Sequence, residues 1–158
     1  MTTSFDRSLS RRLILQGAGA ALLIGLGNCP ALAAANDKYP EDAFKQKSDA
    51  DAIKALYGKT AEPSDKVKLD APEIAENGAV VPIAVTTTLA DVTSISFFVS
   101  ENPNALAASY VIAEGTVPSI ANRLKMQKTA NVSVIVESEG KLFSATKEVK
   151  VTVGGCGG

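Results

Sequence analysis

One cysteine near the end of the sequence lies between two pairs of glycines. The segment reads Gly154-Gly155-Cys156-Gly157-Gly158. Glycine has the largest ordering cost of any residue and no side chain to bury, so we do not expect this segment in a core. We predict a flexible arm, residues 154–158, that offers the thiol of Cys156 to a narrow pocket on another protein. From Val153 the three residue steps reach at most about 10–11 Å.

The composition excludes much of conventional enzymology. The chain has 158 residues, no histidine and two cysteines. The absence of histidine excludes Ser-His-Asp and Cys-His nucleophile pairs and histidine-ligated metals, and two cysteines are too few for a cysteine-only zinc site. A formal net charge of −1 gives no basic surface for nucleic acid. We therefore expect no metal, no cofactor and no nucleic-acid partner.

The first 35 residues have the anatomy of a bacterial export signal. Arg11 and Arg12 precede an apolar stretch over residues 13–26, and small residues follow at 31–35. The apolar stretch is shorter than the roughly twenty residues that cross a bilayer, so we expect no transmembrane helix. The adjacent arginines predict export by the twin-arginine route to the periplasm, although Gln16 replaces the usual lysine.

A stable membrane anchor is not expected either. Cys29 follows Asn28, where a lipid-attachment signal requires a small residue. Cleavage after Ala33 or Ala35 would remove Cys29 and leave one cysteine. The remaining chain would carry 13 basic and 16 acidic groups, a net charge of about −3, by subtraction of three arginines and one aspartate.

Residues 36–62 are predicted to form a short helical segment. Apolar side chains between Phe44 and Tyr57 have spacings that fit one helical face. Ser48 is a candidate N-cap followed by two aspartates, and Gly58 is a stop signal. We expect two short helices, or one helix broken near Ser48.

From residue 63 to residue 153 the apolar pattern has a period of two, which is typical of strands with one buried face. The alternating stretches are 67–69, 81–85, 95–99, 110–112, 132–136 and 149–153. Turn signals such as Glu139-Gly140 separate them. Six or seven short antiparallel strands predict an all-β, immunoglobulin-like β-sandwich. Pro82 lies inside one stretch and predicts an edge strand or a bulge there.

Some stretches carry apolar side chains on both faces. Phe98 lies opposite Phe97, and Ile135 lies opposite Val134. Two explanations remain open: the helical segment packs on the second face, or a partner protein covers it.

The single thiol of the exported chain has three interpretations. It can link two copies of the chain through a disulfide, it can be an incidental residue of a frayed tail, or it can be a covalent carrier loaded and unloaded by other enzymes. No Lys or Arg is adjacent to Cys156. We therefore expect an ordinary thiol pKa of about 8.5, with activation supplied by a partner's pocket.

Three stretches resemble the SoxY family, the sulfur-carrying subunits of bacterial thiosulfate oxidation. They are residues 149–158, which end in GGCGG; Ala43-Phe44 with residues 52–58; and residues 71–82. The twin-arginine leader also fits this family. The similarity extends over essentially the whole chain, and the GGCGG motif matches without departure.

The resemblance implies a function and a set of partners. Cys156 would hold sulfur intermediates covalently, and the chain would be a carrier without catalytic activity. It would form a heterodimer with a SoxZ-like subunit. A SoxAX-type haem enzyme would couple thiosulfate to Cys156, a SoxB-type hydrolase would release sulfate, and in some organisms a sulfane dehydrogenase would act on the remaining sulfur. The alternative function is an exported structural β-sandwich protein that dimerises through a Cys156 disulfide.

Overall fold

The computed structural model describes residues 39–153. The predicted export signal, with Arg11 and Arg12, and the predicted arm, residues 154–158, lie outside the described residues. Tyr39 belongs to a separate unit with the residues before it, so we describe the fold from Pro40 onward. No helix among the described residues combines the length and the hydropathy needed to cross a membrane.

Two short helices precede the strands. They are α2 (Glu41–Phe44) and α3 (Asp49–Tyr57). Ser48 caps α3, because its Oγ accepts a hydrogen bond from the N–H of Asp51 at 3.2 Å. Gly58 ends the helix with a φ of 67°, which glycine adopts without strain, and its N–H donates to the carbonyl oxygen of Lys54 at 2.8 Å. The first alternative, two short helices, is confirmed.

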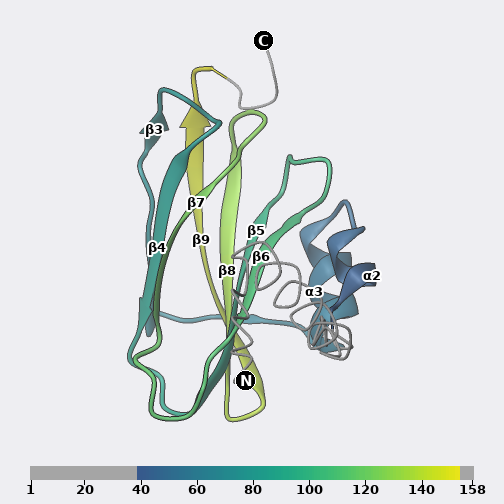
Figure 1. The fold of residues 1–158 in the computed structure, drawn as a ribbon, viewed down its shortest axis with the longest axis vertical. Helices are drawn as coiled ribbons and strands as arrows, with labels where there is room; N and C mark the ends of the chain where they lie inside the picture. The colour runs from purple at the N-terminus through teal and green to yellow at the C-terminus, as the bar shows by residue number, and fades with distance from the viewer. Residues whose placement is uncertain (1–38, 154–158) are drawn as a thin grey trace, which may run out of the picture. The chain divides into compact units, whose positions relative to one another are not determined.

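Over the described residues, nine strands form two sheets (Figure 1). The larger sheet has the order β1-β9-β8-β5-β6, and β3 also pairs with β9; the smaller sheet has the order β2-β4-β7. The bounds are β1 Glu62–Pro63, β2 Val67–Asp70, β3 Ile74–Ala75, β4 Val81–Thr87, β5 Val92–Val99, β6 Leu106–Val111, β7 Ser119–Leu124, β8 Ala130–Ser138 and β9 Lys141–Val151. The predicted β-sandwich is confirmed. Two short parallel pairings, β1 with β9 and β3 with β9, add to the antiparallel ones.

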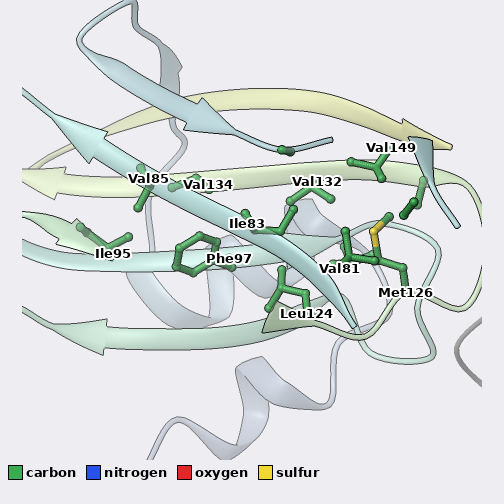
Figure 2. Packing of buried hydrophobic residues seen from close by; sticks show 14 of the residues in the cluster. Val81, Ile83, Val85, Ile95, Phe97, Leu124, Met126, Val132, Val134 and Val149 are labelled. Carbon is green, nitrogen blue, oxygen red and sulfur yellow. The ribbon is translucent and has the colours of Figure 1, made fainter. Parts of the chain in front are cut away.

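The core lies between the two sheets. Every second residue of β4 and β8 points inward, as the period of two predicted. Figure 2 shows these side chains with Phe97 of β5, which is fully buried. The ring of Phe97 meets that of Tyr110 edge to face, with centroids 6.1 Å apart. Each fully buried Val or Phe side chain contributes about 1.5–3 kcal/mol, so this cluster is the main source of stability.

The helical segment covers the outer face of β5 and β8. Phe98 and Ile135 are buried there in a second cluster that includes Ala52 of α3. The hydroxyl of Tyr57 forms a hydrogen bond of 2.7 Å with Ser96 Oγ on the same face. Packing by the helical segment is therefore confirmed, and these two apolar side chains need no partner protein to bury them.

Two strands differ from the sequence prediction. β7 was not predicted, because only Ile120 and Leu124 in it are large and apolar. β9 begins at Lys141, well before residue 149. Leu142 packs under the helical segment while Phe143 packs on the main core, so both faces of early β9 are apolar and the period of two is blurred.

Pro82 does not lie on an edge strand, as one alternative predicted. β4 is the central strand of the smaller sheet, and Pro82 pairs with Arg123 of β7. The pairing of β2 with β4 ends at Asp70 and Ala84. Proline, which lacks the N–H of a ladder hydrogen bond, therefore lies where β4 has β7 but not β2 as its neighbour.

Candidate functional site

The predicted attachment residue and its four glycines lie outside the described residues. The structure therefore defines the site up to Val153, three residues before Cys156. We call residues 150–153 the arm root. We call the end of the sandwich at which β9 ends the arm end; β3 lies at this end too (Figure 1).

The arm root is held along one side by the segment that precedes β4. β3 runs parallel to β9, with Ile74 opposite Lys150. The N–H of Lys150 donates to the carbonyl oxygen of Glu73 at 2.9 Å, and the N–H of Thr152 donates to that of Ala75 at 3.1 Å. These bonds extend the pairing of β3 with β9 to the last residues before the predicted arm. Because their backbone groups are paired, these residues have a fixed position.

A loop of residues 76–80 holds the last described residue. The N–H of Gly78 donates to the carbonyl oxygen of Val153 at 2.8 Å. The side chain of Asn77 shapes this loop, since its Oδ1 accepts a hydrogen bond from the N–H of Ala79 at 2.8 Å, as in an Asx turn. The carbonyl oxygen of Gly78 in turn accepts from the N–H of Met126 at 2.7 Å.

Two threonine hydroxyls add hydrogen bonds that hold the arm root. Thr152 Oγ1 donates to the carbonyl oxygen of Glu76 at 2.9 Å. Thr129 Oγ1, from the loop between β7 and β8, accepts a hydrogen bond from the N–H of Val151 at 2.9 Å. Residues 73–78, 126–129 and 150–153 are far apart in sequence and meet here. The arm root therefore has a defined position relative to the rest of the sandwich.

The arm root rests on the end of the main core. Met126 is fully buried beside Val81, at the end of the cluster to which Val149 also contributes (Figure 2). Because a close-packed core resists displacement, these residues support the loops that hold Val151 and Val153.

The perturbed ionisable groups belong to the helical segment. Burial raises the pKa of Tyr57, while its hydrogen bonds with Ser94 and Ser96 act in the opposite direction. Burial also raises the pKa of Asp49 at the start of α3. Exposed Glu41 and Lys45 form an ion pair at 2.6 Å, and a hydrogen bond from Lys45 lowers the pKa of Glu41. These groups serve the packing of the helices and are not part of the arm root.

Metal-binding groups do not gather in residues 39–153, where no cluster of three or more Cys, Asp or Glu side chains has the required proximity. The arm root fixes the position of Val153, three residues before Cys156 in the sequence.

Sequence reasoning missed the contacts that hold the arm root. Asn77 and Gly78 lie in a stretch that resembles the SoxY family, but no contact with residues 150–153 was predicted for them, and Thr129 carried no signal at all. Their role depends on the parallel pairing of β3 with β9, which has no short-range sequence signature.

Comparisons with known proteins agree with the resemblance. The family model of the sulfur oxidation protein SoxY matches residues 53–156. Among solved structures, the sulfur carrier protein SoxY from Chlorobium limicola f thiosulfatophilum is similar to this chain with 41% identity and a TM-score of 0.60, over 66% of this chain and 96% of that one.

A remote likeness is to the endo-beta-1,4-mannanase from Thermotoga petrophila, at 10% identity and a TM-score of 0.42, over 66% of this chain and 23% of that one. That likeness has no bearing on function. No curated protein matches the chain.

Proposed function

This chain belongs to the SoxY family of sulfur carriers, and we propose that it holds sulfur intermediates covalently on Cys156 during thiosulfate oxidation. The observation that supports this proposal is the extent of the family match, which runs from residue 53 through Cys156 itself. Gly154, Gly155, Gly157 and Gly158 would give the thiol access to slim pockets, since they add no side chains around it.

The proposed chemistry balances only with partner enzymes. Joining the thiol of Cys156 to the outer sulfur of thiosulfate forms an S–S bond and releases one proton and a pair of electrons. A SoxAX-type haem enzyme would accept these electrons. On a SoxB-type hydrolase, water would then add to the sulfur of the terminal sulfonate and break its bond to the neighbouring sulfur, which releases sulfate and a proton and leaves a persulfide on Cys156. A sulfane dehydrogenase would oxidise that sulfur further in some hosts. The carrier itself would catalyse no step.

The proposal includes a location and a stable partner. A SoxZ-like subunit would form a heterodimer with this chain. Arg11 and Arg12 support export of the folded protein by the twin-arginine route into the periplasm, where residues 1–35 would be removed.

Mass spectrometry of the peptide that contains Cys156 tests the proposal. The protein is incubated with thiosulfate and periplasmic extract from sulfur-oxidising cells, beside the variant Cys156→Ser. We expect sulfur or sulfonate adducts on Cys156 and none on the variant. A protein that yields only a Cys156 disulfide dimer, without adducts, would instead be the exported structural sandwich.

A further inference from the structure

Asn77 and Gly78 form the one Asn-Gly pair of the sequence. In such a pair the backbone nitrogen of the glycine can attack Cγ of the asparagine, since glycine has no side chain to block the approach. The new bond closes a succinimide ring, and the side-chain nitrogen leaves as ammonia with the proton of the attacking N–H. Water then opens the ring to aspartate or isoaspartate. We propose that Asn77 is a deamidation site whose rate is set by the arm root.

The group under attack is accessible and is already oriented. Asn77 is exposed to solvent. Its Oδ1 accepts the hydrogen bond from the N–H of Ala79 at 2.8 Å, and the ring closed by that bond contains both Asn77 Cγ and the nitrogen of Gly78. Negative charge develops on Oδ1 during the attack, so the N–H of Ala79 donates to the atom that gains this charge. The turn therefore favours the reaction.

The attacking nitrogen, in contrast, is protected by the arm root. Gly78 is buried, and its N–H donates to the carbonyl oxygen of Val153 at 2.8 Å. The nitrogen becomes a nucleophile only after it loses this proton to a base in water, and a buried, paired N–H does not meet such a base. The carbonyl oxygen of Gly78 is fixed as well, by the N–H of Met126 at 2.7 Å. Deamidation therefore requires an opening that separates Gly78 from Val153.

Such an opening involves the arm root and not the core. Thr152 and Val153 are exposed, so their hydrogen bonds can break while the buried cluster stays packed. When opening and closing are fast relative to the attack, the reaction rate is proportional to the fraction of open molecules. The rate of deamidation at Asn77 therefore measures how often the arm root opens.

The isoaspartate product cannot hold the arm root as asparagine does. In isoaspartate the backbone passes through the former side chain and gains a carbon atom. The two residues that flank this position both bind the arm root through their backbone: the carbonyl oxygen of Glu76 accepts from Thr152 Oγ1, and the N–H of Gly78 donates to Val153. The additional atom changes their spacing, so the two bonds cannot both keep their geometry. Each opening thus carries a risk of irreversible damage to the arm root.

The test compares the unchanged protein with Thr152→Val and Ser138→Ala in mildly alkaline buffer. Thr152→Val removes the bond of 2.9 Å to Glu76 in the arm root. Ser138→Ala is the matched control: it removes a bond of 2.6 Å to the carbonyl oxygen of Ala90 near the opposite end of the sandwich, where β9 begins. Mass spectrometry with peptide fragmentation follows the conversion of amide to acid at residue 77.

The two variants should differ in rate. For Thr152→Val we expect deamidation about two- to tenfold faster than in the unchanged protein, since the loss of one hydrogen bond shifts an opening equilibrium by about that factor. Ser138→Ala should stay within about twofold, because the two sites are distant. Equal acceleration in both variants would show that the reaction follows global unfolding, and would overturn the role of the arm root.

Two further measurements test the protection and the site. In guanidinium chloride no arm root covers Gly78, so the unfolded proteins should all react at one rate, about tenfold or more above that of the folded unchanged protein. Asn77→Ser, whose Oγ can accept from the same N–H, should show no conversion at residue 77. Equal rates in the folded and unfolded protein would overturn the protection by Val153. Absence of conversion in the unfolded protein would overturn Asn77 as the site.

The reaction involves none of residues 154–158. Its outcome is therefore independent of the adducts on Cys156, by which the proposed function is tested separately.

Discussion

The two ends of the sandwich differ in the segments that their hydrogen bonds hold in place. At the arm end, hydrogen bonds join segments far apart in sequence, as between Gly78 and Val153. At the opposite end, bonds that close local turns, such as the N–H of Thr116 with the carbonyl oxygen of Ala113 at 3.1 Å, lie beside bonds between distant segments, such as Ser138 Oγ with the carbonyl oxygen of Ala90 at 2.6 Å. The hairpin between β8 and β9 turns through Glu139 and Gly140, whose φ values are 50° and 72°.

This difference indicates what each end does. Local turns are sufficient to reverse the chain between strands. A contact between distant segments costs additional loop-closure entropy, but it fixes one part of the chain relative to another. At the arm end such contacts position Val153, three residues before Cys156 in the sequence. We infer that the contacts at the arm end fix the position of Val153.

The largest expected effect follows from removing the support under the arm root. Met126→Ala should lower the free energy of unfolding by about 2–5 kcal/mol, because Met126 is fully buried and its loss leaves a cavity. Val117→Ala, at the exposed opposite end, should change it by less than about 0.5 kcal/mol. Urea unfolding measures both. If Met126→Ala lowered the free energy of unfolding by less than about 1 kcal/mol, Met126 would not pack in the core beneath the arm end as we describe.

A smaller effect distinguishes position from stability. Thr129→Val removes the acceptor for the N–H of Val151, and Ser138→Ala removes a hydrogen bond of 2.6 Å to the carbonyl oxygen of Ala90 near the opposite end. Each should cost about 0.5–1.5 kcal/mol.

Hydrogen exchange separates the two variants. Only Thr129→Val should accelerate exchange at the amide of Val151, and only it should slow the loading of Cys156. If Ser138→Ala slowed loading equally, the contrast between the two ends would be wrong.

The smallest effect concerns the helical segment, which should influence neither end. Burial raises the pKa of Tyr57, so the folded protein keeps this proton at a pH where the unfolded chain has lost it. The stability from Tyr57 is therefore fully present below its ordinary pKa of about 10 and is lost as the pH rises through the raised value. In urea unfolding, the free energy of unfolding of the unchanged protein minus that of Tyr57→Phe should decrease above about pH 10. A difference in the free energy of unfolding that stays constant with pH would contradict the raised pKa of Tyr57.

Local patterns in the sequence predicted much of the fold. The alternation at Val81, Ile83 and Val85 identified β4, and the Ser48 cap and Gly58 stop identified α3, because each signal acts within a few residues. β7 and the first half of β9 were not predicted from such patterns. Their burial depends on neighbours that come from elsewhere in the chain, which no local period reveals.

The candidate site divides in the same way. Cys156 was predicted as a site from its residue type and its glycine neighbours, and its role as a carrier came from the resemblance to the SoxY family. The contacts that hold the arm root could not be predicted, because they form only when β3 pairs with β9.

Growth on thiosulfate is the most direct test of the central claim that Cys156 carries the sulfur. A sulfur-oxidising host that lacks its own carrier gene is given either this chain or Cys156→Ser, with equal amounts of folded protein verified. We predict growth with the unchanged chain and none with the serine variant. Growth of both strains at the same rate would contradict the account.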